Sequence, residues 1–185
     1  ETLSTGTYIK YVHFSDATMV VYVDPKVKVN YGSAWANADT TLATINSATL
    51  NASVDEVFRG YDISQTINGG DGSDTVDYAY ASPVTANLIT GKVSEGSGSS
   101  VDTLLNIENI ISGSGSDLLI GNSANNLLNA GAGNDNVFGG AGNDTLMGVG
   151  GADKLYSGSG SDLVYFDTAA SVIDGGADDK VGHAH

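Results

Sequence analysis

The feature that most constrains this chain is a nine-residue repeat between residues 112 and 165. The stretch "SGSGSDLLI GNSANNLLN AGAGNDNVF GGAGNDTLM GVGGADKLY SGSGSDLVY" divides into six units without a gap. The sixth position of these units holds Asp117, Asn126, Asp135, Asp144, Asp153 and Asp162. The eighth position is always aliphatic: Leu119, Leu128, Val137, Leu146, Leu155 and Val164. A fixed period with one core residue per unit predicts a repeat architecture.

Five of the six units open with a stretch of six residues that holds two or more glycines, and every unit closes with three residues such as "TLM" at 145–147. Glycine is costly inside helices and strands, whereas aliphatic, β-branched and aromatic residues favour strands. Each unit is therefore predicted to be a turn followed by a short strand, with two units forming one coil of eighteen residues. The predicted fold is all-β: a right-handed parallel β-roll, or solenoid, with irregular N-terminal capping strands.

The chain is predicted to have three regions. Residues 1–50 form an N-terminal β capping or lead-in region, because their β-type runs are not repetitive. Residues 51–111 form a degenerate segment of the roll, and residues 112–182 form the regular roll. The degenerate segment contains one full unit, "GGDGSDTVD" at 69–77, and the stretch "VTANLITGKV", which is expected to be an outer hairpin or a longer strand pair.

A weaker duplication extends the repeat frame into the degenerate segment. The full unit at 69–77 has Asp74 at its sixth position and Val76 at its eighth. Glu56 and Glu108 also fall at the sixth position of their frames. We expect two winding segments, interrupted by the inserted hairpin and loop but not ended by them.

The charge balance favours a cationic partner. The chain has 22 acidic and 7 basic residues and a formal net charge of -15. Nucleic acid would be repelled by this charge, whereas cations or a basic protein would be attracted. The absence of cysteine excludes disulfides and thiolate metal sites, and no apolar run is long enough to predict a membrane span.

The turn "GGAGND" at 139–144 combines residues that suit a hard cation. Glycine allows main-chain conformations that direct carbonyl oxygens toward one point, and the aspartate adds a carboxylate. Calcium prefers a flexible cage of six to eight oxygens, whereas magnesium demands stricter geometry and zinc prefers His or Cys. The turn composition therefore predicts calcium binding.

These units resemble the G-G-x-G-x-D-x-U-x nonapeptide of RTX proteins, also known as the hemolysin-type calcium-binding repeat. "GGAGNDTLM" and "GGDGSDTVD" match the motif in full, whereas "SGSGSDLLI", "AGAGNDNVF" and "SGSGSDLVY" differ only at the first glycine. "GVGGADKLY" differs by one small residue, and "GNSANNLLN" departs most. The resemblance covers about residues 51–181 and implies a calcium-binding parallel β-roll.

The resemblance further implies that each ion lies between turns stacked on the same side of the roll. One edge would stack turns 112–117, 130–135 and 148–153, and the other would stack 121–126, 139–144 and 157–162. We expect about four or five calcium ions between residues 112 and 182, the last involving 175–179, and another beside Asp74 with turn 51–56. The site with Asn126 should be the weakest. The expected ligands are Asp74, Asp117, Asn126, Asp135, Asp144, Asp153, Asp162, Gly113, Gly115, Gly131, Gly133, Gly140, Gly142, Gly158 and Gly160.

The resemblance also implies a bacterial protein of the type I secretion route. Such a chain is exported unfolded and folds outside the cell when calcium neutralises its stacked carboxylates. The first residues, "ETLSTGTYIK", lack the features of a secretory signal, which either this route or excision from a longer chain explains. The abrupt end after "VIDGGADDKV" is typical of an excised fragment. We therefore expect a fragment of a larger extracellular or cell-surface protein, which this module stabilises or presents.

Other interpretations apply to the same sequence. Asx turns can stabilise a solenoid without any metal. Catalysis is not expected, since His13, His183 and His185 belong to no catalytic motif. The aromatic residues Tyr8, Tyr11, Tyr22, Tyr31 and Trp35 leave open an accessory module that binds a polysaccharide or a cell-surface protein.

Overall fold

The computed structural model describes residues 12–15, 18–21, 28–31, 34–37, 44–45, 55–60, 64, 66–96, 100–167, 172–176 and 180–183. Every regular element in these ranges is a strand, which confirms the predicted all-β class. The strands of the N-terminal region and degenerate segment are β1 (Val12–Ser15), β2 (Thr18–Val21), β3 (Lys28–Tyr31), β4 (Ala34–Asn37), β5 (Thr44–Ile45), β6 (Asp55–Arg59), β7 (Thr66–Asn68), β8 (Thr75–Asp77), β9 (Val84–Asn87), β10 (Lys92–Glu95), β11 (Val101–Leu105) and β12 (Asn109–Ile111). Those of the regular region are β13 (Leu118–Ile120), β14 (Leu127–Asn129), β15 (Asn136–Ala141), β16 (Thr145–Gly148), β17 (Lys154–Ser159), β18 (Leu163–Phe166), β19 (Val172–Asp174) and β20 (Lys180–His183).

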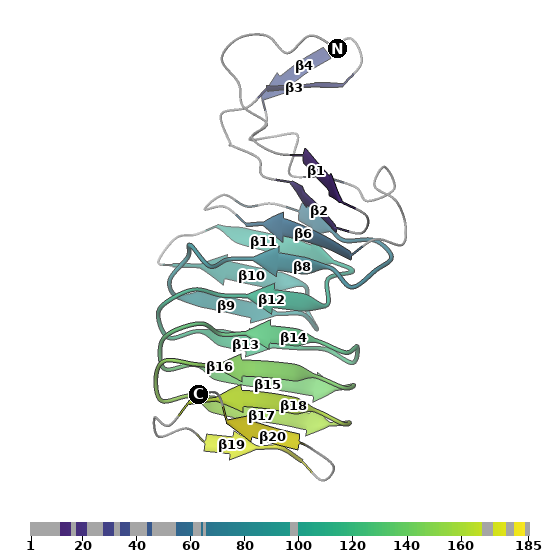
Figure 1. The fold of residues 1–185 in the computed structure, drawn as a ribbon. Helices are drawn as coiled ribbons and strands as arrows, with labels where there is room; N and C mark the ends of the chain where they lie inside the picture. The colour runs from purple at the N-terminus through teal and green to yellow at the C-terminus, as the bar shows by residue number, and fades with distance from the viewer. Residues whose placement is uncertain are drawn as a thin grey trace.

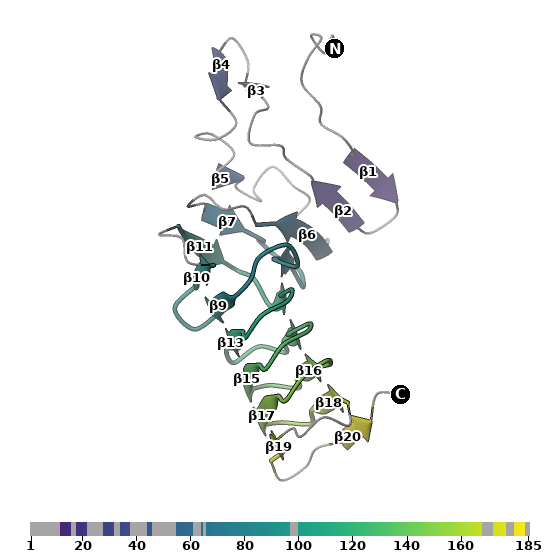
Figure 2. The same ribbon diagram turned by 90° about the vertical axis from the view of Figure 1, so that its left-hand side faces the viewer.

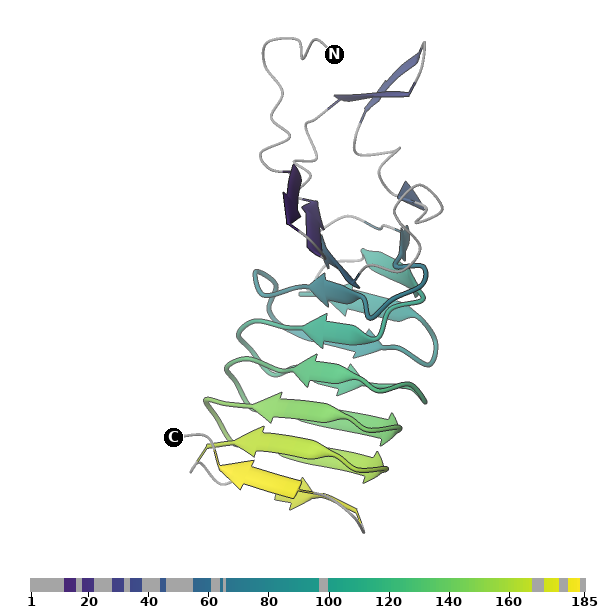
Figure 3. The same ribbon diagram turned by 45° about the vertical axis from the view of Figure 1, so that its right-hand side comes forward.

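Two nine-stranded sheets form the walls of the roll (Figure 1). The first has the order β1-β2-β6-β8-β12-β14-β16-β18-β20, and the second has the order β19-β17-β15-β13-β9-β10-β11-β7-β5. From β12 onward the chain alternates between the sheets, so that consecutive strands face each other and alternate strands pair in parallel (Figure 3). Leu119 pairs with Val137, and Leu128 with Leu146. This eighteen-residue offset confirms the prediction of two units per coil.

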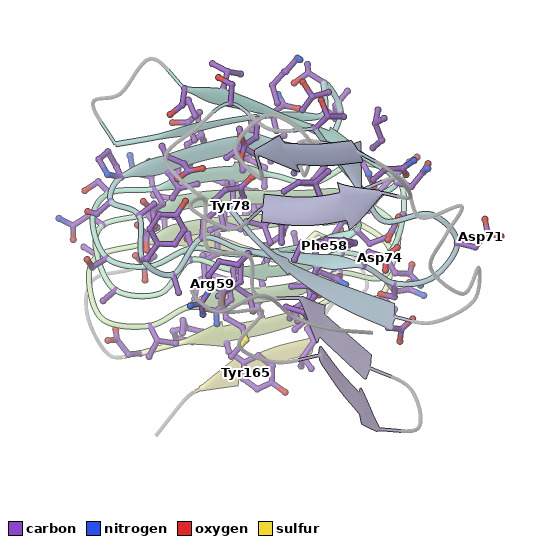
Figure 4. All side chains as sticks on the ribbon, turned by 90° about the horizontal axis from the view of Figure 1, so that it is seen from above. Phe58, Arg59, Asp71, Asp74, Tyr78 and Tyr165 are labelled. Atoms are coloured by element: carbon purple, nitrogen blue, oxygen red, sulfur yellow. The ribbon has the colours of Figure 1, made fainter. Side chains whose placement is uncertain are left out.

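The core consists of side chains that both sheets direct into the space between them. The eighth-position residues of all six regular units are completely buried, as are Val76 and Ile110 in the degenerate segment. Strand alternation explains this pattern, because the central residue of each three-residue strand points inward and its neighbours point outward. Viewed along the roll, Phe58 and Tyr78 also lie between the walls, whereas Asp71 projects outward from a turn (Figure 4).

The inserted segment is a strand pair, the second of the two expected arrangements, and not an outer hairpin. Strands β9 and β10 do form an antiparallel pair, but β9, β10 and β11 all lie within the second sheet, between β13 and β7. In the first sheet, β8 pairs directly with β12. The expectation of an outer position was wrong because Val84, Ala86 and Val93 are buried in the core, which requires these strands to continue the wall.

The described N-terminal strands continue both sheets beyond the repeats. Strand β2 pairs in parallel with β6, β1 pairs with β2, and β5 pairs in parallel with β7. Strands β3 and β4 form a separate pair that contains Tyr31 and Trp35. Tyr8, Tyr11, Tyr22 and His185 lie outside the described residues. Within the described ranges, the structure contains no helix with the length and apolar character needed to span a bilayer.

Candidate metal centre

The turns stack along two edges of the roll, as the repeat frame predicted. On the first edge, the amide of Ala132 donates to the carbonyl oxygen of Gly113 at 2.9 Å. On the second, the amide of Ala141 donates to the carbonyl oxygen of Asn122 at 3.1 Å. Figure 2 looks onto one edge, where successive turns lie one below another. Equivalent turns are therefore neighbours in space although they are eighteen residues apart.

Glycine is required where adjacent turns approach most closely. Gly133 has a φ of 147°, and an ideal Cβ on it would lie 1.4 Å from the carbonyl oxygen of Gly115. Gly160 has a φ of 139°, and its Cβ would lie 1.7 Å from the oxygen of Gly142. Any larger residue would be strained and would collide with the main chain. The predicted glycines with positive φ are Gly115, Gly131, Gly133, Gly140, Gly142, Gly158 and Gly160.

Main-chain oxygens from both turns border each gap. Between turns 121–126 and 139–144, an ideal Cβ on Gly140 would lie 2.3 Å from the oxygen of Asn122. A Cβ on Gly121 would lie 2.1 Å from the oxygen of Gly139. Because these positions carry no side chain, main-chain oxygens of the adjacent turn can approach this closely. Such oxygens are the ligand type that calcium prefers.

The sixth-position carboxylates join each turn to the previous turn on the same edge. On the first edge, Asp135 Oδ1 accepts a hydrogen bond from the amide of Asp117 at 2.8 Å, and Asp153 Oδ1 accepts one from Asp135 at 2.9 Å. On the second edge, Asp144 Oδ1 accepts from the amide of Asn126 at 2.8 Å, and Asp162 Oδ1 accepts from Asp144 at 2.7 Å. Each of these carboxylates therefore lies in the gap between two stacked turns.

The second oxygen of these carboxylates is the decisive feature. Asp117, Asp135 and Asp144 are each only 1% exposed, and their Oδ2 atoms accept no hydrogen bond within the described part of the chain. Burial raises the pKa of Asp135 and of Asp144 from 3.8 to about 6, and it raises the pKa of Asp153 as well. A buried carboxylate oxygen is costly without a counter-charge. The three side chains therefore fit a site that supplies a cation.

Asn126 provides an internal contrast. Its Oδ1 accepts a hydrogen bond from the amide of Asn122 at 2.8 Å, and its Nδ2 donates to the carbonyl oxygen of Glu108 at 2.7 Å. Both polar atoms of the amide are thus satisfied by the protein. This side chain brings no charge, and its nitrogen cannot bind a cation.

The degenerate segment reproduces part of the same pattern. The amide of Asp74 donates to Glu108 Oε2 at 2.9 Å, which places Glu108 in the role of a sixth-position carboxylate. Burial raises the pKa of Glu108. On the other side of this turn, the amide of Ser73 donates to Asp55 Oδ1 at 2.8 Å. The side chain of Glu56 and residues 177–179, which belong to two of the predicted sites, lie outside the described residues.

The fifth position of the repeat carries a second ladder that sequence reasoning missed. Asn143 Oδ1 accepts from the amide of Ser161 at 2.8 Å, and Asn134 Oδ1 accepts from the amide of Ala152 at 2.8 Å. Asn125 Oδ1 likewise accepts from the amide of Asn143 at 2.7 Å. These bonds run in the opposite direction from those of the sixth position. Asparagine at the fifth position of three consecutive units was the available signal.

Sequence reasoning also missed a polar contact inside the degenerate segment. Tyr78 is completely buried, and its hydroxyl donates to Asp102 Oδ2 at 2.8 Å. Burial, followed by the nearby Asp102 carboxylate, raises the pKa of Tyr78 well above its ordinary value. No repeat links these two positions, which meet only because β11 is inserted into the wall.

No group of three or more Asp, Glu or His side chains suited to a metal occurs in the described ranges. This result follows from the architecture, because each gap places one sixth-position side chain among main-chain oxygens. The predicted ligands are therefore brought together in successive gaps and not in one cluster. A site of this kind depends on the turn conformation as much as on the acidic side chains.

Comparison with known families agrees with this geometry. The model for the RTX calcium-binding nonapeptide repeat (4 copies) matches residues 60–78, 111–146 and 138–169. These repeats belong to the RTX family. The RTX matches include the complete unit at 69–77 and all six regular units, whereas residues 79–110 lie outside them. A search of curated proteins found no match to the chain.

Proposed function

We propose that this chain is a calcium-binding RTX module whose β-roll folds when calcium binds. One observation carries the proposal: Asp117, Asp135 and Asp144 each bury a carboxylate oxygen that has no hydrogen bond among the described residues. A purely structural Asx turn would need only the Oδ1 contact, and asparagine could supply it. The recurrence of aspartate, with its second oxygen enclosed, favours a cation.

The ions would lie between stacked turns, with two gaps on each edge of the regular roll. The sixth-position aspartates would supply carboxylate oxygens, and the turn residues, including the predicted glycines, would supply main-chain oxygens. The gap between turns 121–126 and 139–144 should bind most weakly, because the amide of Asn126 already bonds within the protein. Asp74 is the expected ligand of a further ion in the degenerate segment. Bound calcium would supply positive charge and tie adjacent turns together.

The energetics would couple binding to folding. Without a cation, the folded roll must hold buried carboxylates in successive coils, with one central core residue per strand to oppose the cost. The unfolded chain can hydrate these groups. Calcium binds the assembled gaps and not the unfolded chain, so its binding free energy becomes folding free energy.

This coupling would suit a bacterial protein that leaves the cell unfolded. The chain would remain unfolded at low intracellular calcium, which would allow export by the type I route. It would then fold in the calcium-rich exterior. We further propose that residues 1–50 cap the roll, that residues 51–111 and 112–182 form its degenerate and regular parts, and that it stabilises or presents a larger extracellular protein. No catalytic reaction is proposed for the module.

Far-UV circular dichroism during a calcium titration from a chelated start tests the proposal. We expect a cooperative gain of β signal as calcium rises from micromolar to millimolar, with no comparable gain in magnesium. Magnesium is the matched control because it has the same charge but stricter coordination geometry. An unchanged, fully folded spectrum in chelator would refute calcium-driven folding.

A further inference from the structure

The turn at residues 78–83, "YAYASP", lacks the glycine and aspartate of the nonapeptide but stacks on the first regular turn. It joins β8 to β9, and β9 pairs in parallel with β13, with Thr85 beside Leu118. Turn 112–117, which joins β12 to β13, is therefore its neighbour on the first edge. This stacking arises from the inserted strands and lies outside the repeat pattern.

Asp117 makes the same contact to this turn that later aspartates make to regular turns. Its Oδ1 accepts a hydrogen bond from the amide of Val84 at 2.7 Å. The corresponding bond between the amide of Asp117 and Asp135 Oδ1 is 2.8 Å. The carboxylate of Asp117 is therefore placed in the gap between turns 78–83 and 112–117.

Oxygen atoms of the irregular turn also border this gap. An ideal Cβ on Gly113 would lie 2.3 Å from the carbonyl oxygen of Ala79 and 3.0 Å from that of Ala81. An ideal Cβ on Gly115 would lie 2.3 Å from Ser82 Oγ. In the next gap on this edge, a Cβ on Gly131 would lie 2.0 Å from the oxygen of Gly113. The irregular turn thus presents oxygens to the first regular turn at a similarly close approach.

The second carboxylate oxygen indicates what this gap can hold. Asp117 is 1% exposed, and its Oδ2 accepts no hydrogen bond within the described residues. Ser82 and Ser116, one from each turn, are exposed, so that water can complete a coordination shell. The two turns thus bring a buried carboxylate, two main-chain oxygens and a hydroxyl to this gap, and these are donor types that calcium prefers.

We propose that calcium also binds between turns 78–83 and 112–117, held by the Asp117 carboxylate, the carbonyl oxygens of Ala79 and Ala81, and the Ser82 hydroxyl. This inference rests on the proposed calcium-binding function of the roll. The additional ion would tie the inserted strands to the first regular coil. It would extend the metal-binding edge beyond the last nonapeptide, into a turn that the motif does not describe.

Counting bound ions by native mass spectrometry at saturating calcium tests this site. Asp117→Asn removes the carboxylate charge, whereas Gly113→Ala would place a methyl group 2.3 Å from the carbonyl oxygen of Ala79 and so displace this oxygen from the gap. The φ of Gly113 lies outside the left-handed region, so alanine requires no unusual main-chain conformation there. Gly121→Ala is the matched control, because its Cβ would fill a gap on the opposite edge, 2.1 Å from the oxygen of Gly139.

We expect Asp117→Asn and Gly113→Ala each to bind one ion fewer than the wild type, because the neighbouring gap with turn 130–135 keeps the carboxylate of Asp135. Their double variant should lose that same ion only. Asp117→Asn combined with Gly121→Ala should lose two ions. An unchanged count in Asp117→Asn, or two ions lost in the Asp117/Gly113 double variant, would overturn the proposed site. If Gly113→Ala does not fold in calcium, the Asp117→Asn count decides. A wild type that binds no calcium would instead refute the proposed function of the whole roll.

Discussion

Turns 121–126 and 139–144 are neighbours on one edge, but they treat their sixth-position side chains differently. Asn126 uses both polar atoms within the protein, accepting from Asn122 and donating to the oxygen of Glu108. Asp144 uses Oδ1 to accept from the amide of Asn126, and its buried Oδ2 accepts no hydrogen bond from the described residues. Turn 121–126 satisfies the polar atoms of its sixth-position side chain within the protein. The buried carboxylate of Asp144 in turn 139–144 instead requires a proton or a cation.

This contrast separates the structural role of the sixth position from its metal-binding role. An amide or a carboxylate can accept the main-chain hydrogen bond that links adjacent coils. Only the carboxylate adds a buried negative charge, which is unfavourable in the empty roll and favourable beside calcium. Substitutions at the two positions should therefore have opposite effects with calcium and with chelator. In chelator, an osmolyte such as sucrose favours the folded state and keeps it populated, so that the free energy of unfolding can be measured.

The largest expected effect is that of removing calcium from the whole roll. At a calcium concentration 100 times the dissociation constant, each occupied site adds about 2.7 kcal/mol to the free energy of unfolding. Urea unfolding in saturating calcium and in chelator measures the total. Equal urea midpoints under the two conditions would show that the turns with a sixth-position aspartate do not depend on calcium for their stability.

Asp144→Asn should make turn 139–144 behave more like turn 121–126. In saturating calcium we expect a loss of about 2–3 kcal/mol in the free energy of unfolding, because one site is weakened. In chelator we expect a gain of about 1 kcal/mol, because a buried charge is removed. Chemical denaturation under both conditions measures these changes. The same sign in both would argue against separate structural and metal-binding roles.

Asn126→Asp tests the contrast in the opposite direction. In chelator the free energy of unfolding should fall by about 1–2 kcal/mol, because the hydrogen bond to Glu108 is lost and a charge is buried. In calcium, the variant should bind the ion between turns 121–126 and 139–144 more tightly than the wild type does. Isothermal titration calorimetry measures the affinity, and no increase over the wild type would place the calcium ligand elsewhere in the turn.

The pH dependence of the calcium-free roll should be the reverse of ordinary acid denaturation. Asp135 and Asp144 have folded-state pKa values of about 6, above the ordinary value of 3.8, because both are buried. The folded state therefore binds protons more tightly than the unfolded state. Their contribution to stability is fully present below pH 3.8 and is lost as the pH rises through about 6. Urea midpoints between pH 4 and 7 in chelator measure this trend, and a rising midpoint over that interval would contradict it.

The smallest expected effect concerns the fifth-position ladder. Asn143→Ala removes the acceptor for the amide of Ser161 and should lower the free energy of unfolding by about 1 kcal/mol. Because this ladder carries no charge, the loss should be similar in calcium and in chelator. Asn134→Ala is the matched control on the other edge. A loss confined to the calcium-bound state would instead connect the fifth position with metal binding.

Much of the regular roll could be predicted because its interactions repeat. The nine-residue period located each buried aliphatic residue, from Leu119 to Val164, and the eighteen-residue coil followed from pairing alternate units. The family comparison agrees with the recognised motif. The sixth-position residues could be selected in the same way, because aspartate recurs where the turns stack. The same residue types recur at the same positions of each unit, so the structure of one unit predicts that of the next.

The tertiary structure decided what has no period. Strands β9 to β11 enter the wall itself, which brings Tyr78 to Asp102 and the amide of Val84 to Asp117. The structure also shows that Oδ1 of a sixth-position aspartate accepts a hydrogen bond from the preceding coil, whereas Oδ2 is buried. The sequence alone does not distinguish the two oxygens. The sequence by itself determined the repeat, its core and its oxygen-rich turns. Only the stacking of separate coils determined which atoms share a gap, because those contacts depend on the strand order and not on distance along the chain.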